Sequence, residues 1–199
     1  MTTGPQVLVP GRTNAPVIAT FHSLTGGVGG TMAVVNCAAL LAAAGHRVLV
    51  IDWDLAAPRV HDYLRPFLDE TAGLGGLIGL ARRYGEIRSD ERFSAGALDP
   101  VQQITRLDTR ELELPGLVDY LPPTDPAELL RRFTFGRGWD ELPTGVDVGE
   151  FAAALRRSLA GTHYDYVLVD APDGNSDAAH AATGPLPDVL VLGCLPVAD

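Results

Sequence analysis

The chain has 199 residues, of which 46% are hydrophobic and 20% are charged, so its composition fits one globular domain with a substantial core. Its formal net charge of −10 argues against an open nucleic-acid surface, because binding to phosphates depends on a surplus of basic side chains. No apolar run reaches the roughly 18 residues that a membrane-spanning helix needs, so we expect no membrane segment.

The two ends of the chain and its two cysteines bear on domain limits and compartment. Residues 1–15 are rich in Pro, Gly and Thr and are expected to form a flexible tail, with a single domain over 16–199. The tail lacks the basic and apolar segments of a secretion signal. Cys37 and Cys194 both lie in apolar stretches, so we expect two buried thiols and no disulfide framework. The expected compartment is therefore the reducing cytoplasm.

The sequence of the first part of the domain predicts a strand, a glycine-rich loop, a helix and a second strand. Val17–His22 is a short β-favouring run that stops at the glycines. Thr31–Ala44 carries no charge and is apolar all round, which predicts a helix that is buried on most faces and ends at Gly45. Arg47–Asp52 is typical of a fully buried strand in a parallel sheet. Together these segments form one βαβ unit.

Strands and helices continue to alternate along the rest of the chain. We expect a helix around Gly75–Tyr84, whereas the polar stretch Gly85–Pro115 has no predicted element. Asp125 and Asp147 are each followed three residues later by glutamate, which is typical of a helix start. Three further strands are predicted, at 117–121, 164–170 and 189–195. The alternation predicts a doubly wound α/β fold with a mainly parallel sheet.

The loop Thr25–Thr31, with the sequence TGGVGGT, has the composition of a phosphate-binding turn. Its glycines let the backbone fold around an anion and present N–H groups to it. The start of the following helix adds positive partial charge, and the Thr31 hydroxyl is placed to reach Mg²⁺. Asp52 and Asp54 lie at the end of the next strand, at the edge where open α/β sheets bind their ligands.

Three motifs in this order resemble the deviant Walker A ATPases of the ParA/MinD group. One subgroup carries the loop as KGGVGRTMA, followed by DWDLEAP and by a segment YDYVLIDSRTGxSD. The corresponding segments here are TGGVGGTMA at 25–33, DWDLAAP at 52–58 and YDYVLVDAPDGNSD at 164–177. The match covers most of residues 17–199 and implies a P-loop NTPase fold of the ParA/MinD type.

The resemblance implies ATP and Mg²⁺ as cofactors and assigns roles to residues of these motifs. Mg²⁺ would be held by Thr31, Asp52 and Asp170, and Asp54 would position the attacking water. The nucleotide would contact Gly26, Gly27, Val28, Gly29, Gly30, Thr31 and Met32. The residues alone also allow another interpretation, in which a tight turn and helix-capping acids account for these positions.

Two loop positions depart from the family. The signature lysine, which reaches the nucleotide of a dimer partner, is Thr25 here, and the basic residue that contacts the β- and γ-phosphates is Gly30. All 15 basic residues of the chain are arginines, so only an arginine such as Arg59 or Arg65 can stand in. The arginine of the family's SRT segment also has no counterpart. Each lost charge-assisted bond to an anion costs about 1.5–3 kcal/mol, or about 10- to 150-fold in binding.

Some residues near these motifs have two interpretations. His22 and Trp53 are interpreted as packing or edge residues. Asp173, Ser176 and Asp177 follow the strand ending at 170, where they would either cap a helix or contact the edge of the nucleotide.

Functions of different classes follow from these observations. One is a ParA/MinD-like ATPase with weak or slow Mg-ATP binding and hydrolysis, working as a homodimer or as a heterodimer with a related chain. Another is a pseudo-ATPase that serves as a non-catalytic binding or scaffold partner of another protein. A third is a loop that binds a different anionic ligand. Family members continue beyond the fifth strand, so we expect a fold shortened at the C-terminus whose open sheet edge invites a partner.

Overall fold

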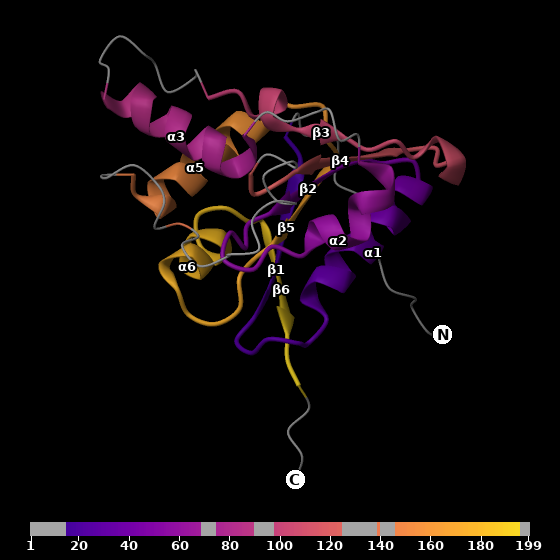
Figure 1. Ribbon diagram of the computed structural model, residues 1–199, viewed down its shortest axis with the longest axis horizontal. Helices are drawn as coiled ribbons and strands as arrows, with labels where there is room; N and C mark the ends of the chain where they lie inside the picture. Colours follow the sequence, from indigo (N-terminus) through magenta and orange to yellow (C-terminus); the bar gives the residue numbers. More distant parts are fainter. Residues whose placement is uncertain (1–14, 69–74, 90–97, 125–138, 140–145, 196–199) are drawn as a thin grey trace, which may run out of the picture.

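The computed structural model describes residues 15–68, 75–89, 98–124, 139 and 146–195, which build a six-stranded sheet with helices on both faces (Figure 1). In sheet order the strands are β3 (Thr105–Arg106), β4 (Leu117–Leu121), β2 (Arg47–Asp52), β5 (Tyr166–Asp170), β1 (Val17–Ser23) and β6 (Val189–Gly193). All neighbouring strands are parallel except β3 and β4, which are antiparallel. The predicted doubly wound, mainly parallel α/β fold is confirmed.

Two hydrophobic clusters separate the helices into two layers. One face of the sheet packs against α1 (Gly30–Ala43) and α2 (Val60–Leu64). The other packs against α3 (Gly76–Ser89), α5 (Val148–Leu159) and α6 (Asp177–Thr183). Short 3-10 turns at 65–67, 100–103 and 110–112 join these elements. Within the described residues, no helix is long and apolar enough to cross a membrane.

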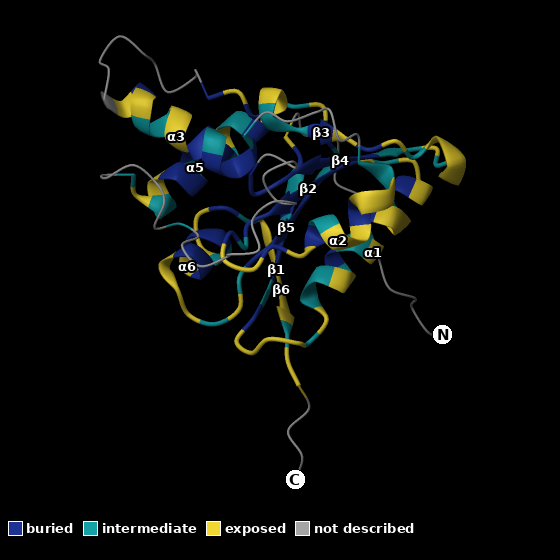
Figure 2. Cartoon of the chain, viewed as in Figure 1, coloured by how far each residue is buried: buried dark blue, intermediate teal, exposed yellow. Residues whose placement is uncertain are grey.

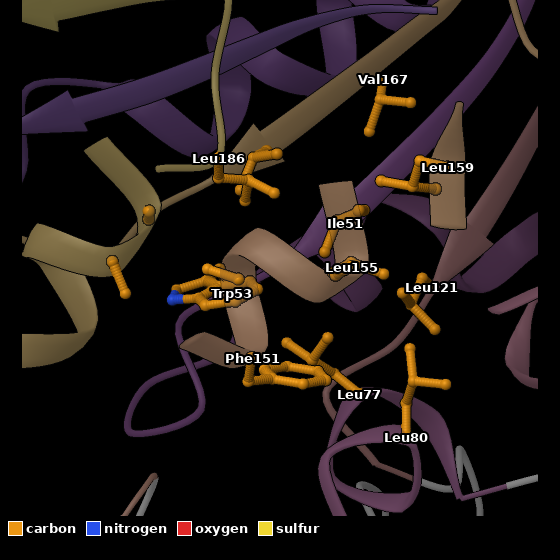
Figure 3. Close-up of a cluster of buried hydrophobic side chains, with 14 of the residues drawn as sticks. Ile51, Trp53, Leu77, Leu80, Leu121, Phe151, Leu155, Leu159, Val167 and Leu186 are labelled. Atoms are coloured by element: carbon orange, nitrogen blue, oxygen red, sulfur yellow. The ribbon is translucent and has the colours of Figure 1, made fainter. Parts of the chain in front are cut away.

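Trp53 anchors the helices of the second layer to the end of β2 (Figure 3). Its side chain is fully buried, and its indole N–H donates to the carbonyl oxygen of Ala178 in α6 at 3.0 Å. Its ring stacks on Phe151 of α5, with 5.9 Å between the centroids, and lies 4.6 Å from the ring of Trp139. Trp53 is therefore a packing residue, as predicted.

The prediction that α1 is buried on most faces is wrong. Only Val34, Ala38 and Ala42 of this helix are buried, whereas Leu40 is 71% exposed. Figure 2 shows the exposed residues along the outer side of α1. The helix packs one face on the sheet, and among the described residues nothing covers the other face. Apolar composition all round therefore does not signal burial in this helix.

Cys194 also departs from expectation. It lies directly after the edge strand β6 and is exposed, while Cys37 in α1 is only partly buried. The prediction of two buried thiols is therefore wrong, because the apolar runs that contain them lie at the outside of the sheet and of the first helical layer.

Element boundaries follow the sequence signals closely at several places. Asp147 caps α5 as predicted, since its carboxylate accepts the backbone N–H of Glu150 at 2.7 Å. The helix start predicted at Asp125 lies outside the described residues. The strand predicted at 164–170 begins two residues later, and the one predicted at 189–195 ends at Gly193.

Candidate functional site

A pocket of about 300 Å³ opens at the carboxyl ends of β1 and β5, beside the glycine loop. The loop contributes Gly26 to Thr31, and the first turn of α1 contributes Met32. The other lining residues are Phe21, His22, Ser23, Asp54, Ala57, Arg59, Tyr63, Asp170, Ala171 and Asp173. The structure therefore brings the predicted loop residues together with two of the predicted acids.

The glycine loop has the backbone that a small anion needs. Gly27 and Gly29 have φ angles of 79° and 86°, a region that side chains disfavour, so the turn depends on glycine at both positions. Gly29 is the N-cap of α1, and no side chain caps the helix start. No acidic residue lies in the first turn of α1 either. The first N–H groups of this 14-residue helix are therefore left for water or a ligand.

Gly30 differs from its neighbours in the loop. It is the first residue of α1, its φ is not positive, and a Cβ added there would meet no atom within 4 Å. The backbone at this position therefore accepts a side chain. The turn does not require glycine here, so loop geometry does not explain the absence of a basic residue at this position.

Thr31 and Asp170 lie together at the mouth of the pocket. The Thr31 hydroxyl donates to the Asp170 carboxylate. Burial raises the pKa of Asp170 to about 6, while the bond from Thr31 and the charge of Arg59 act in the opposite direction. Two of the three oxygen ligands expected to hold Mg²⁺ are therefore in contact.

Asp52 lies below the pocket and does not line it. Its Oδ2 accepts the backbone N–H of Val60 at 3.2 Å and the hydroxyl of Tyr120 at 3.3 Å. Its Oδ1 is buried and has no hydrogen-bond partner within the described part of the chain. Burial raises the pKa of Asp52 well above its usual value, and the charges of Asp170 and Asp54 raise it further. The environment of this side chain therefore favours its protonated form over its charged form.

Asp54 faces the pocket from the segment after β2. Its Oδ1 accepts the backbone N–H of Ala57 at 3.0 Å, an interaction that fixes the turn leading to α2. Burial raises the pKa of Asp54, and hydrogen bonds from backbone N–H groups lower it. The carboxylate therefore both shapes a turn and lines the pocket, so the two interpretations of this acid are compatible.

For Asp173, the sequence allowed either a helix cap or a contact with the edge of the nucleotide. The Ser23 hydroxyl donates to its Oδ1 at 2.5 Å, and a Cβ added at Gly26 would lie 2.9 Å from its Oδ2. Asp173 thus leans on the glycine loop, while Ser176 caps α6 by accepting the N–H of Ala179 at 3.2 Å. Capping therefore explains Ser176 but not Asp173.

The charged side chains that line the pocket are mostly acidic. Asp54, Asp170 and Asp173 supply carboxylates, and among the described residues Arg59 is the only arginine in the lining. Arg59 lowers the pKa of both Asp54 and Asp170 through its charge. Within the described ranges, no three acidic, histidine or cysteine side chains converge as a preformed metal site. The donors that Mg²⁺ prefers are present, but in this structure they are directed to protein partners.

Comparisons with known proteins agree with this arrangement. Residues 19–160 match the family described as the CobQ/CobB/MinD/ParA nucleotide binding domain. No curated protein matches the chain.

Several solved structures share the fold at low sequence identity. A plasmid partition protein from Borrelia burgdorferi is 18% identical, with a TM-score of 0.55 over 89% of this chain and 64% of that one. A variant McdA from Cyanothece in complex with ATP is 16% identical, with a TM-score of 0.57 over 90% of this chain and 56% of that one. Cobyrinic acid a,c-diamide synthase from Mycobacterium smegmatis, with bound ADP and magnesium, is 18% identical, with a TM-score of 0.55 over 90% and 60%. The chain thus spans less than two thirds of the length of these structures.

The family match, the order of the strands and the position of the glycine loop lead to one conclusion: the chain belongs to the CobQ/CobB/MinD/ParA family of nucleotide-binding domains.

Proposed function

We propose that this chain is a nucleotide-binding module of the ParA/MinD type that binds Mg-ATP weakly and hydrolyses it at a rate close to background. The observation that carries the proposal is a pocket built on a glycine loop and a helix N-terminus, with Thr25 and Gly30 at the two positions where the family has cations. Support for the ligand class comes from relatives whose structures hold ATP, or ADP with magnesium.

In this proposal the backbone does most of the binding. The N–H groups of Gly26 to Thr31 surround the phosphates, and the uncapped start of α1 adds its dipole. Thr31 and Asp170 would hold Mg²⁺. Asp52, which lies below the pocket, would affect the ion only through these two residues. The ion would offset phosphate charge and so reduce repulsion from the acidic lining. Asp54 would orient the water that attacks the terminal phosphate.

The charge balance of the pocket explains why binding should be weak. Two absent cations remove about 1.5–3 kcal/mol each, so an ordinary micromolar site becomes roughly millimolar. Catalysis should suffer more, because cations near the transferred phosphoryl group stabilise charge that develops in the transition state. Arg59, which lines the pocket, is our candidate for the remaining cation.

Calorimetric titration with ATP and ADP in the presence of Mg²⁺ tests the proposal, together with a phosphate-release assay. We expect dissociation constants from about 0.1 mM to the millimolar range and turnover at the level of the no-enzyme control. Binding at low micromolar concentration with ordinary turnover would contradict the proposal. Such a result would mean that a cation outside Thr25 and Gly30 restores the site.

A second candidate function is a non-catalytic binding or scaffold partner. The observation that favours it is the acidic lining, since Asp54, Asp170 and Asp173 oppose a polyphosphate in the absence of the loop cations. This alternative predicts no heat of binding with any nucleotide up to several millimolar. It also predicts that changes in the pocket leave binding to the partner protein, either a second copy or a related chain, unaffected.

A further inference from the structure

The turn that follows β5 is tied to the end of β1 at three points, and it carries Asp173 to the glycine loop. The two strands are parallel neighbours in the sheet (Figure 1). The His22 ring donates through Nδ1 to the carbonyl oxygen of Pro172 at 3.0 Å. The Ser23 hydroxyl donates to Oδ1 of Asp173 at 2.5 Å, and the Gly174 N–H donates to the carbonyl oxygen of Ser23 at 2.9 Å. Contacts on both sides of Asp173 therefore fix where its carboxylate lies.

The Asp173 carboxylate lies beside the backbone that would surround a phosphate. Asp173 lines the pocket together with the loop residues Gly26 to Thr31. A Cβ added at Gly26 would lie 2.9 Å from Oδ2 of Asp173. The negative charge of Asp173 raises the pKa of both Asp54 and Asp170. Because this charge acts on two other groups that line the pocket, it also acts on an anion bound between them.

The contacts that hold this turn need a hydrogen-bond acceptor at Asp173 but no charge. The Ser23 hydroxyl donates to one carboxylate oxygen, and the amide oxygen of an asparagine would accept the same bond. Capping does not require the carboxylate either, since the side chain that caps α6 is that of Ser176. The negative charge is therefore not needed for the turn, and its effect falls on the ligand that binds beside it.

Phosphate ligands differ in how strongly such a charge repels them. Free ATP carries about two more negative charges than AMP, and a bound Mg²⁺ ion cancels about two charges. Even at the dielectric constant of water, one charge at about 10 Å changes affinity about twofold for each charge on the ligand. A carboxylate beside the glycine loop therefore disfavours free ATP most, and it disfavours Mg-ATP about as little as AMP.

We propose that Asp173 is a specificity-determining residue that makes this pocket select phosphate ligands by their charge and favour Mg-bound nucleotide over free nucleotide. This role rests on the proposed function, because it requires phosphate to bind at the glycine loop. It is separate from the absence of cations at Thr25 and Gly30, since it comes from a carboxylate that the turn does not need. The ligand class is a phosphate compound of low net charge.

Calorimetric titrations of the full chain with AMP, ADP and ATP at low salt test this role, with ATP titrated once in EDTA and once with Mg²⁺. Asp173→Asn keeps the acceptor for Ser23 and removes the charge. We expect this variant to bind AMP and Mg-ATP about fourfold more tightly than wild type, ADP about eightfold and free ATP about sixteenfold. Asp173→Glu retains the charge, so it should gain no more for free ATP than for AMP.

Asp177→Asn is the matched control. Asp177 lies in the first turn of α6, four residues further along the chain, and it is exposed but does not line the pocket. Its substitution removes the same charge from the chain and should change each affinity by less than about twofold. An equal gain in Asp177→Asn and Asp173→Asn would overturn the proposed role, because the effect would then belong to the net charge of the chain.

The pattern across ligands separates selection by charge from a structural role, because a residue that only shapes the turn affects all nucleotides alike. Weaker binding in Asp173→Asn, or an equal gain for AMP and free ATP, would overturn the proposed role. If wild type binds no nucleotide up to several millimolar but Asp173→Asn binds free ATP, the proposed function fails and the role of Asp173 stands. Weak binding of Mg-ATP by wild type with no gain in the variant would overturn the role alone, and no binding by either chain would overturn both. If circular dichroism shows that Asp173→Asn does not fold, Asp173→Ser replaces it.

Discussion

Asp52 and Asp170 are register partners at the ends of β2 and β5, so two carboxyl groups lie side by side at one buried edge of the sheet. Burial raises the pKa of both groups, and the charge of Asp170 raises the pKa of Asp52 further. The edge therefore holds protons more tightly than the unfolded chain does, which makes the stability of the fold depend on pH near this pair.

We predict that Asp170→Asn stabilises the protein at pH 7.5. The pKa of Asp170 is about 6 in the folded protein, against about 3.9 in an unfolded chain, so the free energy of unfolding falls as pH rises from about 4 to 6 and then levels off. Removing the ionisation should therefore raise stability by up to about 2–3 kcal/mol at pH 7.5 and by little at pH 4. Urea unfolding at both pH values, followed by far-UV circular dichroism, measures the difference.

Asp165→Asn is the control with the opposite sign. The pKa of Asp165 is lowered by hydrogen bonds from Arg47, so its ionised form stabilises the folded state above about pH 4. That variant should lose stability at pH 7.5. An Asp170→Asn variant less stable than wild type at pH 7.5 would contradict the assignment of a destabilising buried charge.

We predict that Asp52→Asn is tolerated and that Asp52→Ala is not. The amide keeps an oxygen for the Val60 N–H and the Tyr120 hydroxyl and carries no charge into a fully buried place. Alanine leaves both donors unpaired, at a cost of about 1–3 kcal/mol for each buried group. Thermal unfolding at pH 7.5 separates the two variants, and equal melting temperatures would show that the bonds to Asp52 contribute nothing.

We predict that Thr25→Lys combined with Gly30→Lys tightens ATP binding by about 1.5–3 kcal/mol for each restored contact. The structure removes the main steric objection, because Gly30 has an ordinary φ and open space around it. Turnover should rise less, since the arginine after Asp170 is still absent. Ala43→Lys, at the exposed far end of the same helix, adds charge away from the pocket and should leave affinity unchanged. A folded double variant that binds no better would mean that the pocket has lost its phosphate geometry.

We predict that Arg59→Ala weakens nucleotide binding at least tenfold, as expected for the loss of a charge-assisted bond. Arg59 makes no side-chain cap to α2, so truncation should not disturb that helix. Arg65→Ala is the matched control, because Arg65 lies just after the same helix but does not line the pocket. Equal losses of affinity in both variants would indicate a general charge effect in place of a contact with phosphate.

We predict no measurable binding to duplex DNA near 150 mM salt. The net charge of −10 leaves little basic surface to release counterions from phosphates. A fluorescence-anisotropy titration with labelled duplex, carried out with and without Mg-ATP, provides the measurement. Binding at micromolar protein would show that the arginines gather into a patch strong enough to overcome the overall charge.

The strands of this fold were predictable because β1, β2 and β5 are continuous apolar runs that end at polar or acidic residues. The helix α2 has five residues and β3 has two, which is too short for periodicity to show. The exposure of Leu40 and Cys194 depends on which elements lie across from them, and local sequence does not carry that information.

The candidate site divides in the same way. Gly27, Gly29 and Thr31 were predictable, because glycine spacing and a helix start are local signals. The bond of Asp52 to Tyr120 joins residues 68 positions apart, and that of Asp173 to Ser23 joins residues 150 apart. Such contacts are set by the order of strands in the sheet, so sequence alone left the partners of these acids open.

The burial of Trp53 between two acids also has a spectroscopic consequence. The chain contains two tryptophans, and their rings lie 4.6 Å apart at a tilt of 39°. Rings held in fixed packing of this kind give a near-ultraviolet dichroism signal, which is lost when the tertiary packing is lost. The Trp53 ring packs on Phe151 of α5, and its indole N–H donates to the carbonyl oxygen of Ala178 in α6. The signal therefore follows the docking of the second helical layer onto β2. Near-ultraviolet circular dichroism therefore reports on the packing of the helices on the face of the sheet opposite α1.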